Sequence, residues 1–268
     1  MKKIIYLMTF ICVVFSLISC SSREKFNIDR VPPNKPILIP HLGDVGDTLY
    51  VDGHLINDSN NGLSPLPDGN RLRLQWYRLI DNDLSVVRIY RYPESLLPKP
   101  VKIDSIRWDN EEYIDRLENT GAYPATQTHW HYFVEAVDMA GNSTISDTVS
   151  FTLINKPLLI SPDHYQEFSN SSELSFQWMN YNTDISRLRL LILKVDDDTE
   201  DGDLRYKEYV WHSDESNVTE NLSFIINYTG NPLPAGAYYW RVDTRGVMDE
   251  NLEYKSGSKS EERKFIIR

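Results

Sequence analysis

The sequence predicts an all-β protein built as two tandem β-sandwiches, and three observations lead to this fold class. Short apolar runs alternate with polar residues and are separated by Asn, Asp, Pro and Gly, as in strand-rich chains. The 16 Tyr and 6 Trp favour strands. No long segment has helical periodicity, and the best short candidate, 109–117, also fits a strand. At 268 residues the chain suits two cores.

The amino-terminal segment has a basic start, an apolar run and small residues before a cysteine. Lys2 and Lys3 precede the apolar stretch 4–18, and Cys20 follows it. This layout is typical of an export signal and resembles the bacterial lipoprotein signal. In that family the leader, here 1–19, is removed, and the cysteine carries diacylglycerol and an acyl chain such as palmitate. The resemblance implies that Cys20 is the lipid-attachment residue and that the membrane is a partner of the mature chain.

Two alternatives to lipidation stay open for this segment. A membrane-spanning helix needs about 20 apolar residues, and the run here is shorter. A plain signal peptidase could cut after Ser19. If Cys20 is lipidated, Ser21 in place of Asp implies the outer membrane of the cell envelope, and the face is left open. Cys12 leaves with the leader, so no thiol remains for a disulfide or a thiolate metal site.

The mature chain is expected to begin with a tether and to continue as two domains. Residues 20–35 are polar and end in prolines, which predicts a lipidated start and a flexible tether with a stiff end. The first domain is expected over 36–155 and the second over 156–268, because the chain repeats itself. The matching segments are 36–40 with 157–162, 72–76 with 174–178, 86–90 with 188–192, 130–134 with 238–242, and 149–153 with 263–267.

Alternation along these segments predicts which side chains form the two cores. In 72–76 the even positions are Leu72, Leu74 and Trp76, and a slip of one residue would expose all of them. The six tryptophans form three apparent pairs, which favours burial. The other hypothesis is a sugar-stacking platform of exposed rings, and Trp108 and Trp211 are its first candidates. The expected core pairs are Trp76 with Trp178 and Trp130 with Trp240.

Each half resembles a fibronectin type III domain. In the first half the resemblance is carried by Trp76, by Arg-Ile-Tyr-Arg at 88–91, and by Ala-Val-Asp-Met-Ala-Gly-Asn at 136–142. The second half matches through Trp178 and 235–242 and lacks the last of these motifs. The resemblance implies two immunoglobulin-like sandwiches. It is silent on function, because such domains carry many unrelated roles.

The segment of about 41–70 is longer than a simple connection between the first two strands. Loops of this length are functional or disordered, and this one is rich in Asp, Asn and Gly. Residues 48–51 predict an extra edge strand. A specific binding surface, if there is one, is expected here first.

Two motifs are candidates for metal binding, and each has a simpler interpretation. The acidic run 196–203 partly matches a calcium-binding loop, but Thr199 and Arg205 stand at positions where the loop pattern has ligand residues. A solvated hairpin tip fits it better. His129 and His131 place two imidazoles on one strand face, opposite the core, and zinc needs a third ligand. We therefore expect no metal and no cofactor.

Composition and motifs favour a non-catalytic envelope protein. Hydrolase, zinc-protease and phosphate-loop motifs are absent from the sequence. Loss of Lys2 and Lys3 takes the formal net charge from −11 to −13, which opposes nucleic-acid binding. The function expected is a lipid-anchored spacer or protein-interaction module without enzyme activity. The alternative is a carbohydrate-binding surface lipoprotein, so an envelope protein or a glycan is the expected partner beside the membrane.

Overall fold

The computed structural model describes residues 29–39, 49–51, 54–56, 62–94, 99–181, 185–195, 207–213, 216–217, 223–246 and 255–268. Within these ranges the regular structure consists of β-strands and one short 3-10 helix, η1 (Ser171–Glu173). The expected all-β fold class is confirmed. The helical candidate contains strand β7 (Glu112–Asp115). The leader with Cys20, and the acidic run 196–203, lie outside the described residues.

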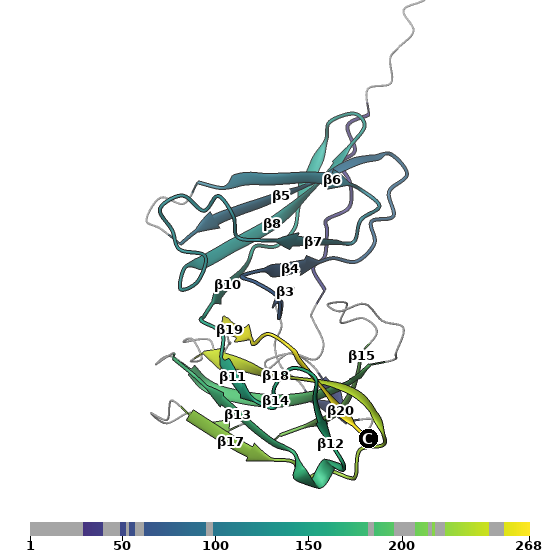
Figure 1. The fold of residues 1–268 in the computed structure, drawn as a ribbon. Coiled ribbons are helices and arrows are strands. Elements are labelled where there is room, and N and C mark those ends of the chain that lie inside the picture. Colours follow the sequence, from purple (N-terminus) through teal and green to yellow (C-terminus); the bar gives the residue numbers. More distant parts are fainter. Residues whose placement is uncertain are drawn as a thin grey trace, which may run out of the picture.

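The first half of the chain folds into two facing antiparallel sheets (Figure 1). One sheet contains β3 (Leu63–Pro65), β4 (Leu72–Gln75) and β7. The other places β5 (Leu84–Pro93) between β6 (Val101–Arg107) and β8 (His129–Asp138). The far edge of β8 pairs first with β10 (Val149–Leu153) and then with β9 (Ser143–Ile145).

The second half repeats this architecture. Its smaller sheet contains β11 (Leu158–Ser161), β13 (Ser175–Met179) and β17 (Ser223–Asn227). Its larger sheet is centred on β14 (Ile185–Val195) and β18 (Gly236–Gly246). The strands paired around these two are β15 (Lys207–His212), β16 (Ser216–Asn217), β19 (Ser256–Lys259), β20 (Arg263–Ile267) and β12 (Gln166–Phe168).

Alternating side chains fill the space between the sheets of each sandwich. Leu72, Leu74 and Trp76 are 0 % exposed, as the sequence pattern predicts. The other three predicted core tryptophans are also buried, and each such ring contributes roughly 2–3 kcal/mol on leaving water. These four indoles are therefore core residues and are unavailable to a sugar platform. They are Trp76, Trp130, Trp178 and Trp240.

The strand ladders correct two details of the predicted repeat. Val134 pairs with Ile89 and Val242 with Leu190, which agrees with the match of 130–134 with 238–242. Trp130 therefore corresponds to Tyr238, and the expected pairing of Trp130 with Trp240 is wrong. The match of 86–90 with 188–192 is wrong by one residue. The pattern could not fix this register, because β14 is apolar on both faces and buries Leu191 and Leu193 on its outer one.

A serine interrupts the last strand of each sandwich in the same way. The Ser146 amide donates to Val134 O at 2.8 Å, and the Val134 amide donates back to the Ser146 hydroxyl at 3.0 Å. Ser260 makes the same two bonds with Val242, at 2.8 and 2.9 Å. The serine hydroxyl accepts the hydrogen bond that a backbone carbonyl of a regular strand would accept. Each strand can therefore bend at the serine while the buried valine amide keeps a partner.

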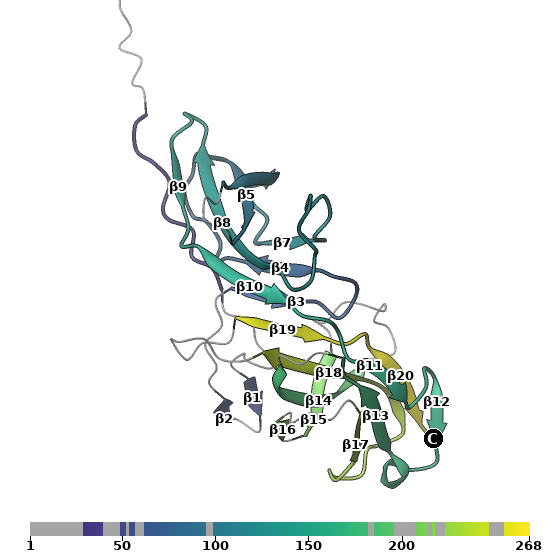
Figure 2. The ribbon, with the colours of Figure 1, turned by 90° about the vertical axis from the view of Figure 1, so that its left-hand side faces the viewer.

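Main-chain pairing joins the two sandwiches. Strands β10 and β19 run parallel, and the Thr152 amide donates to Lys255 O at 2.7 Å. The Ile154 amide donates to Gly257 O at 3.1 Å. The larger sheets of both sandwiches thereby become parts of one twelve-stranded sheet (Figure 2). Within the second sandwich, a Cβ on Gly257 would lie 2.6 Å from Thr244 O of β18, so β19 needs glycine here to pack against its neighbouring strand.

Two lysines of the second half bind β3 and the residues that follow it. The Lys259 ammonium donates to the Ser64 hydroxyl at 3.2 Å, and Lys156 donates to Leu66 O at 2.8 Å and to Pro67 O. Burial lowers the pKa of Lys259 to about 7 and that of Lys156 to about 8. These contacts make β3 a part of the junction.

The predicted insertion 41–70 is shorter than expected, because β3 belongs to the core. All three residues of β3 are buried, and the strand pairs with β4. Residues 49–51 form a strand, as predicted, but this strand, β1 (Leu49–Val51), pairs with β2 (His54–Ile56) and not with the edge of a sandwich. Figure 2 shows this hairpin level with the second sandwich.

The prediction of a flexible tether over 20–35 is wrong for its second half. Pro33 and Pro36 are buried, and the Thr144 hydroxyl donates to Pro33 O at 2.6 Å. The Lys35 ammonium lies 2.6 Å from Asp147. Side chains far along the chain hold this segment against the first sandwich, and a composition rich in proline does not reveal such partners.

Replacement of Lys259 by Met should remove a pH dependence of stability. The lysine has a pKa of about 7 when folded and 10.5 ordinarily, so the unfolded chain binds more protons between these values. Stability of the native protein therefore rises with pH in this window, by about 1.4 kcal/mol per pH unit for a single such group. Urea denaturation at pH 7.5 and pH 9.5 measures the rise. This rise in stability should be smaller by roughly 1–3 kcal/mol in Lys259→Met and unchanged in the exposed control Lys102→Met. An equal rise in both variants would contradict the lowered pKa of Lys259.

Candidate functional site

A cleft of about 650 Å³ opens at the edge of the first sandwich, between β6 and β7. The loop 116–123 that follows β7 forms its third wall. Leu117 and Asn119 adopt left-handed backbone conformations, with φ of 52° and 54°, and so turn this loop sharply. We call this feature the edge cleft.

A buried ion pair lies at the floor of the edge cleft. Arg91 and Asp115 are 6 % and 4 % exposed, and the guanidinium Nη1 lies 2.6 Å from the carboxylate. Nη2 donates to Glu118 O at 3.1 Å, and the guanidinium carbon lies 4.8 Å from the centre of the Trp130 ring. In the second sandwich Ile192 occupies the equivalent position, opposite Trp240.

Asp115 is fully engaged by the residues around it. One oxygen also accepts from the Tyr132 hydroxyl at 2.8 Å, and the other accepts from the Leu117 amide at 2.9 Å. Burial and the Asp115 carboxylate hold the pKa of Tyr132 well above its ordinary value. The carboxylate is therefore a structural acceptor that fixes the strand and the loop, and it lacks the freedom of a general base.

The rim of the edge cleft is polar and lacks stacked ring faces. Burial, Asp115 and Asp104 raise the pKa of Tyr113 to about 12. Tyr123 is exposed, but its ring meets Trp130 edge-on at 73°. Sugar platforms present flat ring faces, and this pair does not. The cleft can offer hydrogen bonds to a polar ligand.

The two tryptophans proposed for a sugar platform do not come together. Trp108 is 36 % exposed and lines a hollow of about 430 Å³ in the first sandwich, with Arg78 and Ile80. Trp211 packs against the second core and meets Tyr228 at 61°. Each indole belongs to a different sandwich, so the described residues give this hypothesis no shared surface.

His129 and His131 lie on the outer face of β8, as predicted. Their ring centres are 5.0 Å apart, His131 stacks on Tyr92 at 4.9 Å, and His129 Nδ1 lies 2.8 Å from the Thr152 hydroxyl. Burial and the neighbouring His129 lower the pKa of His131. Within the described ranges, no third potential ligand joins the two imidazoles.

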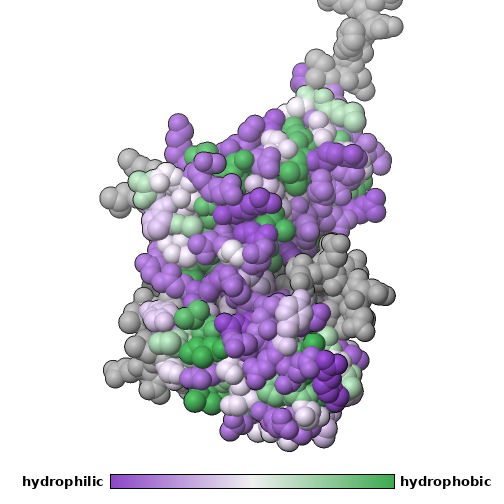
Figure 3. Space-filling view, in the orientation of Figure 1, coloured by the Kyte–Doolittle hydropathy of each residue, from purple (hydrophilic) through white to green (hydrophobic). Residues whose placement is uncertain are grey.

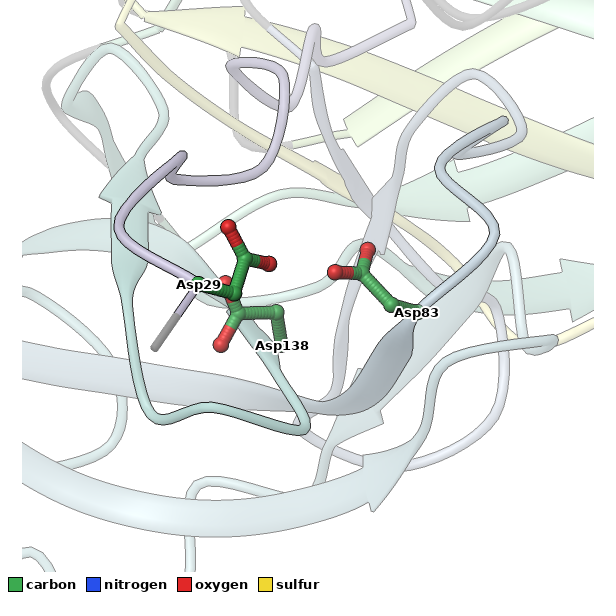
Figure 4. A group of neighbouring side chains, drawn as sticks. All are labelled: Asp29, Asp83 and Asp138. Atoms are coloured by element: carbon green, nitrogen blue, oxygen red, sulfur yellow. The ribbon is translucent and has the colours of Figure 1, made fainter. Parts of the chain in front are cut away.

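Three carboxylates meet where the described chain begins (Figure 4). Ligand oxygens of Asp29, Asp83 and Asp138 lie within 4.8 Å of one another. A hydrogen bond with Asp29 raises the pKa of Asp83. Asp138 belongs to the Ala-Val-Asp-Met-Ala-Gly-Asn motif, and its two oxygens accept from the amide and the side chain of Asn142, both at 2.8 Å. The oxygens are of the type that calcium takes.

The sequence did not reveal this carboxylate group or the ion pair of the edge cleft. Asp29 lies in the presumed tether, and Arg91 and Asp115 are 24 positions apart. The only available signal was Arg91 at an inward position of an otherwise apolar strand face, with Val87 and Ile89. A buried charge in such a place requires a partner.

Comparison with known proteins supplies no family assignment. No family model matches the chain, and no curated protein matches it. The similar solved structures include the FN1–FN3 domains of chicken CNTN1, at 13 % identity and a TM-score of 0.32, covering 89 % of this chain and 69 % of that one. The fibronectin(III)-like modules of Clostridium thermocellum CbhA match at 13 % identity and a TM-score of 0.25, covering 75 % and 86 %. The fold assignment therefore stands on the strand topology itself.

Replacement of Asp115 by Ala should destabilise the protein by roughly 3–5 kcal/mol, because it leaves the Arg91 charge buried without its partner. The double variant Arg91→Met with Asp115→Leu removes both charges and should recover most of the loss. Urea denaturation measures both effects. A free energy of unfolding for Asp115→Ala within about 1 kcal/mol of the native value would show that the pair is not buried as described.

Proposed function

We propose that the protein is a lipid-anchored, non-catalytic protein of the cell envelope that acts as a spacer or protein-interaction module. The observation that carries this proposal is the junction, in which β10 and β19 join two sandwiches into one elongated body. Such a joint suits a spacer, because it fixes the separation of the two ends, whereas a flexible linker between domains would let that separation vary. The fibronectin type III-like fold is compatible with this role but does not select it, because such sandwiches carry many unrelated functions.

The arrangement of charge supports a structural role over catalysis. Two pairs of buried ionic groups are engaged with each other, Arg91 with Asp115 and Arg241 with Asp243. Arg241 Nε lies 2.8 Å from Asp243, and its Nη2 donates to the Tyr209 hydroxyl at 3.2 Å. Such pairs fix strands in place, whereas a catalytic base needs access to substrate.

The visible face of the molecule is mostly polar. Figure 3 shows polar and charged residues interspersed with small apolar areas over this face. No helix among the described residues is long and apolar enough to cross a bilayer. The proposed attachment rests on the resemblance of the segment before Cys20 to a lipoprotein signal, and two or more acyl chains on Cys20 would give a stable anchor. The absence of Asp after Cys20 favours the outer membrane.

Replacement of Cys20 by Ala should release the protein from membranes. The full-length gene product is expressed in a Gram-negative bacterium, and the membrane pellet is compared with the soluble fraction. The native chain and the control variant Cys12→Ala should stay in the pellet, because Cys12 lies in the leader. Continued pelleting of Cys20→Ala would refute the anchor.

A further inference from the structure

One end of the first sandwich gathers the start of the described chain and three turns. Asn142 Nδ2 donates to Asp29 O at 3.2 Å, and the Met139 amide donates to Asp83 O at 2.8 Å. The turn after β6 joins them, because Arg107 pairs with Val86 at the start of β5. We call this end the N-terminal pole; it comprises 29–31, 77–83, 108–111 and 139–142. Figures 1 and 2 show the start of the described chain at this end of the first sandwich.

The three most exposed large apolar side chains of the described residues all lie at the N-terminal pole. Ile80 is 78 % exposed, Met139 is 76 % and Val31 is 73 %. Single exposed apolar residues are ordinary, but these come from three separate segments that the fold brings to one end. Trp108 stands beside Ile80 on the rim of the 430 Å³ hollow. Tryptophan is the residue that favours the boundary between water and hydrocarbon.

The length of chain beyond this pole restricts what can cover it. Asp29 is the first described residue, and Cys20 lies nine positions before it. Nine extended residues span at most about 30 Å. A lipid on Cys20 therefore keeps the N-terminal pole within about 30 Å of the bilayer, while the second sandwich lies at the opposite end of the body (Figure 1).

We propose that the N-terminal pole is a membrane-contact surface, in which Val31, Ile80 and Met139 enter the interface of the bilayer that holds the anchor. The proposal rests on the proposed lipid anchor, which makes the contact intramolecular and lets a small apolar area suffice. Arg30 follows Asp29 in the chain, and Arg78 lines the same hollow as Asp81. Acidic side chains outnumber these two arginines at the pole, so zwitterionic headgroups suit it better than anionic ones. The contact would hold the second sandwich away from the membrane.

Fluorescence from a single label tests this contact. Met139→Cys gives the lipidated protein one free thiol, because Cys20 is blocked and Cys12 is removed. The labelled protein is reconstituted in phosphatidylcholine vesicles with or without a doxyl group on the acyl chain, which quenches dyes that enter the interface. Ile225→Cys, 64 % exposed in β17 of the second sandwich, is the matched control.

We expect quenching of the Met139 label by at least twofold, no quenching of the Ile225 label, and loss of the Met139 quenching when Ile80→Glu is added. Equal, weak quenching at both positions in protein that floats with the vesicles would overturn the membrane contact and leave the lipid anchor standing. Unchanged quenching with Ile80→Glu would also overturn it. If the protein fails to float with the vesicles after reconstitution, both the lipid anchor and this membrane contact are refuted.

Discussion

Main-chain pairing between β10 and β19 is the constraint on which the shape of this protein depends. It places β10 of the first sandwich and β19 of the second sandwich in one sheet, and the amides of Thr152 and Ile154 donate hydrogen bonds across the junction. Lys156 and Lys259 reinforce this pairing, because they bind the β3 region in the opposite sheet of the first sandwich. The two sandwich domains are thereby held in one orientation and form a single body with two distinct ends.

The cores could be predicted from the sequence because a strand has a period of two. Leu72, Leu74 and Trp76 alternate with polar residues, so only one face of the strand can be buried. The register between the two copies could not be predicted, because β14 is apolar on both faces. Trp130 and Tyr238 fill equivalent positions with different rings, and each donates to a carbonyl upstream, Ala125 O at 3.3 Å and Pro234 O at 2.8 Å.

The junction and the buried charges escaped prediction because their partners are distant in sequence. Lys259 meets Ser64 across 195 positions, and neither residue belongs to a recognisable motif. The docked segment after Asp29 was hidden for the same reason. A local signal did exist for the broken strands: Ser146-Asp147 and Ser260-Glu261 occupy matching places in the two copies. Function follows less directly than fold, because neither the edge cleft nor the carboxylate group defines a ligand, and the spacer role remains a proposal drawn from the junction.

Amide hydrogen exchange at Thr152 and Ile154 tests the fused junction most directly. Both amides donate to carbonyls of the second sandwich, so their exchange reports the pairing itself. We expect both amides to exchange as slowly as core amides such as that of Val134, at least about a thousandfold slower than loop amides. Fast exchange at both positions, in a protein whose two cores remain protected, would show that the sandwiches move independently and that the junction is not fused.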